Sequence, residues 1–428
     1  MPDSKAETQA GRDRFGLLYR LTSSFNSSLD LEEVLNRVID EIIATTHAER
    51  GFVMLLESNR EFTFRVARGI DQQTILDPQS QVSLSVVRKV VSEGSPILTS
   101  NAQEDARFDV HGSIVSLRLC SVLCVPLSVQ GRTFGVVYVD NRMQSGVFIQ
   151  EDLELLSAIA SNAAIAIENA RLYQKAVEQG RIERELQIAH QMQISLLPKE
   201  IPQPSGWKFS AYWQPAREMA GDYYDFIPMD DHRIGLMIAD VADKGVPASL
   251  FMAISRTILR ACAREYRSPL EIINAANRMI CAESTSGYFI TLFFAQLDLG
   301  SGELTYVNAG HPPAILHHGL PNQDLELLMR TGIPLGIEEA WIYEQRQLIL
   351  DPGSLLVCYT DGITEAMNSR EEQFRIERLQ KVIVDHASAA NEELVLTIQR
   401  SVADWAGNTE QFDDITLLLA RRATGMGA

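Results

Sequence analysis

The sequence has little cysteine, few positive charges for its length and no long uncharged apolar run. Its five cysteines mostly lie inside apolar segments, and none has paired metal spacing: Cys120, Cys124, Cys262, Cys281 and Cys358. A disulfide scaffold or a cysteine metal centre is therefore not expected. The 38 Lys and Arg against 56 Asp and Glu give a formal net charge of -18, which repels phosphate backbones and anionic lipids. Nucleic acid and membrane are therefore excluded as expected partners.

Hydropathy and length limit the location and the architecture. No apolar run approaches about 18 uncharged residues, and the N-terminus lacks the apolar core of a signal peptide, so we expect a cytoplasmic protein. A chain of 428 residues is long enough for two or three folding units. We predict a disordered segment at 1–14, a first domain at 15–173, a helical linker at 174–200 and a second domain at 201–424.

The first domain has the pattern of a helix-flanked antiparallel sheet. Asp30 and Glu33 fit a capping box in front of a helical apolar repeat. Short apolar or alternating runs at 51–56 and 62–67, and at 121–129 and 133–140, predict two hairpins. This order predicts an α+β fold. Residues 121–127 (SVLCVPL), 135–140 (GVVYVD) and Phe148 before a long apolar helix resemble a GAF sensor domain.

The resemblance to GAF domains implies a small-molecule or protein signal but does not identify it. Asn141, Arg142, Phe148 and Asp152 match only part of the pattern of members that bind cyclic nucleotides. The plainer interpretation is that Phe148 is a packing residue and Asp152 a helix cap. The ligand site of this domain therefore stays unknown at this point.

A helical pattern continues from Asp152 almost to Leu197, with only Gly180 interrupting it. This length exceeds that of an ordinary globular helix and predicts a coiled-coil connector between the domains. The heptad positions within it are Ile182, Leu186, Ala189, Gln193 and Leu196. Two heptads could make a homodimer, which we expect, or could equally pack on the next domain.

Four acidic motifs dominate the second domain. Asp222, Asp240, Asp361 and Asp413 each lie where an apolar run meets glycine or polar residues. Each alone is explained by a turn or a cap, but four in one domain could converge on one cluster of oxygen ligands. Clustered carboxylates repel one another unless cations hold them together, and oxygen ligands favour Mg²⁺ or Mn²⁺.

Five ordered motifs of this domain resemble the PPM metal-dependent protein phosphatases, in the branch of bacterial sporulation phosphatases and sigma regulators. They are 216–225 (AREMAGDYYD), 240–248 (DVADKGVPA), 308–313 (NAGHPP), 360–366 (TDGITEA) and 413–416 (DDIT). The resemblance implies an α-β-β-α sandwich and agrees with the predicted order of strands and helix pairs. No motif departs from the catalytic pattern, and no Cys-x5-Arg motif is present.

The resemblance implies two divalent cations, Mn²⁺ or Mg²⁺, as cofactors. Asp240 would bridge them, with the Val241 carbonyl on one ion, Asp361 and Asp413 on the other, and Asp222 holding the second directly or through water. Asp414 is an additional candidate, for a third ion or a place just outside the ligand set, and the doublet leaves a one-position ambiguity. Two cations would activate a water that attacks phosphorus in line.

The implied activity is that of a signal-gated phosphoserine or phosphothreonine protein phosphatase. The implied substrate is a phosphorylated anti-sigma-factor antagonist of the STAS type. Lys244 is either a contact for the substrate phosphate or a solvated lysine, and His311 is either a general acid or part of a rigid loop. Two alternatives remain: a partner-binding scaffold with structural aspartates, and a phosphatase for small phosphoesters.

Overall fold

The computed structural model describes residues 25, 28–57, 61–71, 73–99, 120–145, 147–283, 287–319 and 324–424. The chain divides into two compact units, Met1–Ile182 and Glu183–Ala428. The segment predicted to be disordered, 1–14, lies outside the described residues. The two units are described separately and are called the GAF unit and the phosphatase unit below, after the families that their sequences resemble.

The GAF unit is built on one five-stranded antiparallel sheet in the order β2-β1-β5-β4-β3. Its elements are α2 (Leu31–Thr46), β1 (Arg50–Leu56), β2 (Phe62–Gly69), η1 (Pro78–Gln81), α3 (Leu84–Glu93), β3 (Ile97–Thr99), β4 (Ser121–Val129) and β5 (Arg132–Asn141). Both predicted hairpins are present, as β1 with β2 and β4 with β5.

Local chemistry explains how this unit begins. Asp30 caps α2 because its side chain accepts hydrogen bonds from the backbone N–H groups of Glu32 and Glu33. The apolar face of α2 packs with one face of the sheet and with the first part of α5 in one core cluster, and α3 packs on the opposite face. Successive side chains of the strands point to opposite faces, so the sheet has an apolar layer on each side.

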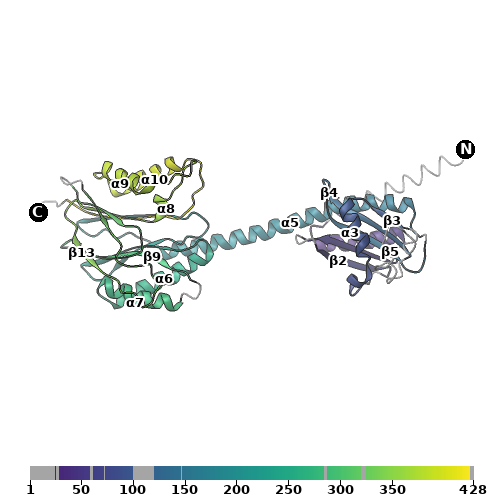
Figure 1. Cartoon of the computed structure of the whole chain (residues 1–428), viewed down its shortest axis with the longest axis horizontal. Helices are drawn as coiled ribbons and strands as arrows, with labels where there is room; N and C mark the ends of the chain where they lie inside the picture. Colours follow the sequence, from purple (N-terminus) through teal and green to yellow (C-terminus); the bar gives the residue numbers. More distant parts are fainter. Residues whose placement is uncertain are drawn as a thin grey trace. The chain divides into compact units, whose positions relative to one another are not determined.

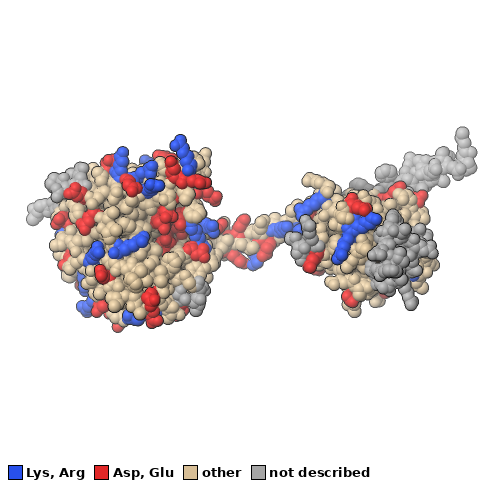
Figure 2. Space-filling model, viewed as in Figure 1, with Lys and Arg blue, Asp and Glu red and all other residues tan. Residues whose placement is uncertain are grey.

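A single helix, α5 (Gln150–Leu196), runs through the boundary between the two units. Its first half is buried in the GAF core at Leu156, Ile159 and Ile167. Its middle is exposed, including Val177 and Ile182, and Figure 2 shows charged side chains of both signs along it. The predicted long helix is therefore confirmed, and the predicted stop at the following prolines holds.

The phosphatase unit contains two five-stranded sheets, β13-β10-β9-β8-β7 and β12-β11-β14-β15-β6. Its strands are β6 (Trp207–Gln214), β7 (Tyr223–Pro228), β8 (Arg233–Val241), β9 (Ile290–Asp298), β10 (Glu303–Ala309), β11 (Ala314–His317), β12 (Leu325–Leu328), β13 (Arg346–Ile349), β14 (Leu355–Tyr359) and β15 (Ile415–Arg422). Its helices are α6 (Val246–Glu265), α7 (Pro269–Glu283), α8 (Asp361–Thr364), α9 (Arg375–Asp385) and α10 (Asn391–Ala406).

The two sheets of this unit form the middle of four layers. Helices α6 and α7 cover the first sheet, and α9 and α10 cover the second (Figure 1). The inner faces of the sheets share one core cluster that includes Leu236, Phe293 and Leu418. The predicted two-domain α+β class, with an α-β-β-α sandwich in the second domain, is therefore confirmed.

In the part of the chain that the structure describes, one helix, α6, is long and apolar enough to cross a membrane by composition alone. Within the phosphatase unit it packs on the first sheet through Met252 and Leu259. Arg256 and Arg260 of this helix pair with Asp225, whose side chain is fully buried. Buried charge pairing and core packing identify α6 as a core helix of this unit.

Candidate functional site

Asp222 lies immediately before β7 and is only 1% exposed. Its Oδ2 accepts hydrogen bonds from the hydroxyls of Thr360 and Thr416, both at 2.7 Å. The two threonines come from the end of β14 and from β15, so strands that are distant in sequence fix one carboxylate. Burial raises the pKa of Asp222 well above its usual value, with further contributions from the charges of Asp240 and Asp414.

Asp240 is the penultimate residue of β8, beside Val241. Burial raises its pKa well above the usual value, and the negative charges of Asp361 and Asp413 add to this effect. A side chain at Gly221 would place its Cβ 3.0 Å from the Val241 carbonyl oxygen. Glycine thus favours the close approach of the loop before Asp222 to the end of β8, because a larger residue would have to push the Val241 carbonyl aside.

Asp361 is the first residue of α8, directly after β14. Burial, followed by repulsion from Asp413 and Glu365, raises its pKa to about 6. Gly362 is constrained more strongly than Gly221, because a Cβ there would lie 2.0 Å from the carbonyl oxygen of Asp414. The predicted Asp-Gly pair therefore places a carboxylate next to the Asp413 and Asp414 backbone.

Asp413 is paired with the one lysine predicted to lie near the site. The Nζ of Lys244 is 2.9 Å from its Oδ2 and donates to the carbonyl oxygen of Phe412 at 2.7 Å. The same ammonium group lies 3.6 Å from the centre of the Phe412 ring. Lys244 is thus held by three contacts in this structure and is not a freely solvated lysine.

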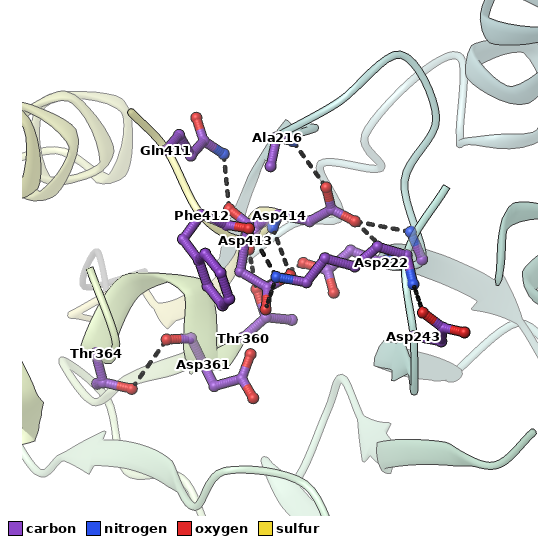
Figure 3. Close-up of polar contacts among 12 residues, drawn as sticks. Ala216, Asp222, Asp243, Thr360, Asp361, Thr364, Gln411, Phe412, Asp413 and Asp414 are labelled. Atoms are coloured by element: carbon purple, nitrogen blue, oxygen red, sulfur yellow. Dashed lines mark hydrogen bonds and ion pairs between the residues drawn. The ribbon is translucent and has the colours of Figure 1, made fainter. Parts of the chain in front are cut away.

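Asp414 holds the loop that carries Asp222. Its Oδ1 accepts the N–H of Ala216 at 2.8 Å and its Oδ2 accepts the N–H of Gly221 at 2.7 Å. The labelled aspartates 222, 361, 413 and 414 lie in one region, with dashed lines from Asp414 to the loop (Figure 3). Both oxygens of Asp414 accept backbone N–H groups, whereas in Asp413 only Oδ1 does so, from the Asp414 N–H at 2.9 Å, and Oδ2 faces the Lys244 ammonium.

The five carboxylates 222, 240, 361, 413 and 414 therefore form one electrostatically coupled cluster. Within the residues that the structure describes, no group of three or more His, Cys, Asp or Glu side chains is already arranged to hold a metal ion. The donors nevertheless fit Mg²⁺ or Mn²⁺ in kind, because they are hard oxygen ligands, and burial followed by mutual repulsion raises the pKa values of Asp222, Asp240 and Asp361.

His311 lies behind this cluster and is fully buried. Its Nδ1 is 2.9 Å from the Thr291 hydroxyl, and its backbone N–H donates to the Asn308 side chain at 2.9 Å. Burial lowers the pKa of His311 to about 3. An imidazole that is neutral at physiological pH and enclosed in a tight turn supports the interpretation of His311 as part of a rigid loop.

In the GAF unit the plainer interpretation of two residues is confirmed. Phe148 is 2% exposed and belongs to the core cluster, and the Asp152 carboxylate accepts the N–H of Ile149 at 3.0 Å at the start of α5. The five cysteines are free thiols, as expected.

Several residues of the site were not predicted. Thr360 and Thr416 bind Asp222, and the Trp213 indole N–H donates to the Asp222 carbonyl oxygen at 2.9 Å. Gln193, predicted as a polar heptad position, is 3% exposed and packs within the phosphatase unit. The position of both threonines inside the motifs 360–366 and 413–416 is a weak signal, because a hydroxyl near an aspartate has many uses.

Comparisons with known proteins agree with both units. The family model "Stage II sporulation protein E (SpoIIE)" matches residues 230–423, and a GAF domain model matches residues 28–168. Phosphoserine phosphatase RsbU of Bacillus subtilis is 32% identical over 246 residues, which are 57% of this chain and 72% of RsbU.

Two further known proteins are similar to this chain. Protein IcfG of Synechocystis sp. is 31% identical over 295 residues, which cover 62% of this chain but only 46% of IcfG. The SiaA-PP2C domain of Pseudomonas aeruginosa has a TM-score of 0.52 at 20% identity and covers 57% of this chain and 99% of that structure. The last likeness concerns the fold alone.

Proposed function

Because the chain belongs to the family of SpoIIE-type phosphatases with phosphoserine phosphatase RsbU, and carries a GAF domain, we propose that it is a signal-gated, metal-dependent phosphoserine/phosphothreonine protein phosphatase. The observation that carries the proposal is the convergence of Asp222, Asp240, Asp361 and Asp413 in one cluster, where burial and then carboxylate repulsion raise the pKa values of Asp222, Asp240 and Asp361. Such a cluster is costly to the fold and is explained by a function that brings cations to it.

In this proposal Asp240 and the Val241 carbonyl, together with Asp222, Asp361 and Asp413, hold two Mn²⁺ or Mg²⁺ ions. Such cations, when bound, supply a water of lowered pKa and neutralise phosphoryl charge. The side chains around the ligands orient them. Asp414 and the two threonines orient the loop and the Asp222 carboxylate, which supports a role for Asp414 outside the ligand set.

The surroundings of Asp361 support a phosphorylated protein as the substrate. A cavity beside this residue is also lined by Thr291, Tyr359, Arg330 and Arg375. Guanidinium groups bind phosphate and carboxylate through paired N–H donors, and the two arginines line this cavity together with Glu365 and Glu377. We propose a STAS-type anti-sigma-factor antagonist as the substrate, within a partner-switching pathway of the cytoplasm.

Gating is proposed to reach the cluster through α5 and α6. Helix α6 begins at Val246, only a few residues after β8 ends at Val241, beside Asp240, so a shift of this helix moves the Asp240 loop. The exposed middle of α5 carries apolar residues such as Val177, Ile182 and Ile188, which supports a homodimer formed along this helix. A signal at the GAF domain would act on that helix.

The test of the catalytic proposal is release of phosphate from a phosphoserine protein as a function of Mn²⁺. Asp240→Asn is expected to lower the rate by at least about 100-fold, a typical loss when a group that stabilises transition-state charge is removed. Asp351→Asn, at an exposed position, serves as the control and keeps the wild-type rate. Equal rates for wild type and Asp240→Asn remove the metal assignment.

Two companion experiments separate the alternatives. Turnover of the phosphoprotein against free phosphoserine distinguishes a protein phosphatase from an enzyme for small phosphoesters, and calorimetric titration with Mn²⁺ distinguishes both from a scaffold that binds no metal. Deleting residues 1–175 tests gating. If activity and oligomeric state both remain unchanged after that deletion, the gating proposal fails.

A further inference from the structure

The C-terminal end of α5 is part of the phosphatase unit, and one of its side chains is unusually buried. Gln193 is 3% exposed, while its neighbours Met192 and Ile194 are 66% and 46% exposed. A glutamine buried at the end of an otherwise exposed helical segment must have partners for its amide group, since an unpaired buried amide is costly. Its partners therefore indicate what this helix end does.

Both ends of the Gln193 amide bind the backbone of one residue, Ala220. The side-chain Nε2 donates to the Ala220 carbonyl oxygen at 2.7 Å, and the Ala220 N–H donates to Oε1 at 3.1 Å. Ala220 is fully buried. The side chain of Gln193 thus satisfies a backbone donor and acceptor in the same way that a neighbouring strand would.

Ala220 lies two residues before Asp222, in the loop that Asp414 holds from the other side through Gly221. Loss of the Gln193 amide leaves the buried N–H and C=O of Ala220 without partners, and an unmade buried hydrogen bond costs more than a made one contributes. Gln193 and Asp414 therefore both hold this loop, and so contribute to the position of Asp222.

A second contact from the same helix reaches the same aspartate. The ring of His190 stacks on that of Trp213, with centroids 5.9 Å apart and planes inclined by 19°. The Trp213 indole N–H in turn donates to the Asp222 carbonyl oxygen at 2.9 Å. His190 and Gln193 are three residues apart, so they project from one side of the helix.

We propose that Gln193 is a positioning residue for the loop that carries Asp222. The position of the C-terminal end of α5 within the phosphatase unit then sets the geometry of the acidic cluster. This proposal deepens the phosphatase function and rests on it. A rotation of α5 by one residue, about 100°, carries Gln193 away from Ala220 and removes both hydrogen bonds at once.

The experiment uses the full chain and compares Gln193→Leu with Gln191→Leu, a change at an exposed position two residues away. The first measurement is hydrogen–deuterium exchange of peptides that cover residues 216–222. In Gln193→Leu we expect exchange there to quicken by about tenfold or more, because protection falls tenfold for each 1.4 kcal/mol of lost stabilisation. In Gln191→Leu it stays at the wild-type rate.

The second measurement is steady-state hydrolysis of a phosphoserine protein, together with the Mn²⁺ dissociation constant from calorimetry. A loop that is mispositioned lowers kcat and weakens Mn²⁺ binding, both by about tenfold on the same scale, while KM stays within about twofold. A merely structural role would lower the melting temperature and leave kcat per folded molecule and Mn²⁺ affinity unchanged.

Two outcomes overturn the proposal: exchange in 216–222 equal to that of Gln191→Leu, or quickened exchange with unaltered kcat and Mn²⁺ affinity. If Gln193→Leu fails to fold, Gln193→Glu decides by the same measurements, because it keeps the acceptor for the Ala220 N–H and loses the donor. Should the wild type release no phosphate, the phosphatase proposal fails, while exchange and Mn²⁺ affinity still decide the role of Gln193.

Discussion

Replacing Asp361 with Asn is expected to stabilise the metal-free protein while removing a proposed metal ligand. Burial, repulsion from Asp413 and repulsion from Glu365 raise the pKa of Asp361 from 3.8 to about 6. A carboxyl group with a higher pKa in the folded state binds its proton more tightly there. Its ionisation therefore costs stability as pH rises from 3.8 to about 6, and the cost is complete above that window.

The size of the effect follows from the shift. About two pKa units at 1.36 kcal/mol each give nearly 3 kcal/mol, and the partial exposure of Asp361 reduces this to on the order of 2 kcal/mol. For a unit of this size that is about 4 to 8 °C in melting temperature. Asn retains an acceptor for the Gly362 N–H, so the gain is not offset by a lost hydrogen bond.

The assay is thermal unfolding of the phosphatase unit within the full chain, in the presence of EDTA, at pH 8 and pH 4. Asp361→Asn is expected to melt higher than wild type at pH 8 and equally at pH 4. Adding Mn²⁺ at 100 times its dissociation constant then stabilises wild type by about 2.7 kcal/mol and the variant much less.

The exposed Asp351→Asn is the matched control and is expected to stay within about 0.5 kcal/mol of wild type. A lower melting temperature for Asp361→Asn than for wild type at pH 8 in EDTA would refute the reasoning, because it would mean that the Asp361 charge stabilises the empty cluster. An equal gain at pH 4 would show that the gain does not come from ionisation.

Four further changes test other parts of the site. Asp225→Asn leaves the two α6 arginines that pair with it uncompensated and should cost about 3 to 5 kcal/mol in urea denaturation; a loss below 1 kcal/mol would contradict this. His311→Gln should flatten the rise of stability with pH between about 3 and 6.5, since the folded imidazole protonates only near 3 and the unfolded one near 6.5; an unchanged slope would contradict it. Lys244→Met should tighten Mn²⁺ binding by about two- to fivefold, because Asp413 then binds the metal without first breaking its ion pair with Lys244; weaker binding in calorimetry would contradict this. Gly221→Ala forces a Cβ to 3.0 Å from a backbone oxygen and should lower kcat by about tenfold or more, which a wild-type rate would disprove.

The elements that the sequence predicts well are those set by local patterns. The Asp30 cap, the two GAF hairpins and the Asp361-Gly362 junction each depend on residues within a few positions of one another. Hydrophobic periodicity and turn chemistry are local, so they can be seen without the fold. The same holds for the length of α5, which the uninterrupted helical pattern predicts.

The contacts that organise the cluster could not be predicted in this way. Asp222 binds Thr360 and Thr416, 138 and 194 positions away, and Asp414 binds the N–H of Gly221, 193 positions away. An aspartate that accepts backbone N–H groups and one that faces a cation look alike in a sequence. Only the fold separates Asp413 from Asp414, because it shows that both oxygens of Asp414 accept backbone N–H groups, whereas Asp413 keeps one oxygen for the Lys244 ammonium.

Gln193 and Asp414 both hold the loop that carries Asp222, but only the contact of Gln193 depends on the linker helix. This difference predicts how strongly the linker can regulate activity. Asp414 belongs to the sandwich, next to the start of β15, and its hydrogen bonds to Ala216 and Gly221 do not involve the linker helix. Gln193 belongs to α5, so its hydrogen bonds to Ala220 are lost whenever that helix shifts. A displaced helix therefore loosens the loop at Ala220 while Asp414 still holds Gly221. Because one support remains, the linker should lower activity by a limited factor, and only the combination of Gln193→Leu with Asp414→Asn should abolish it.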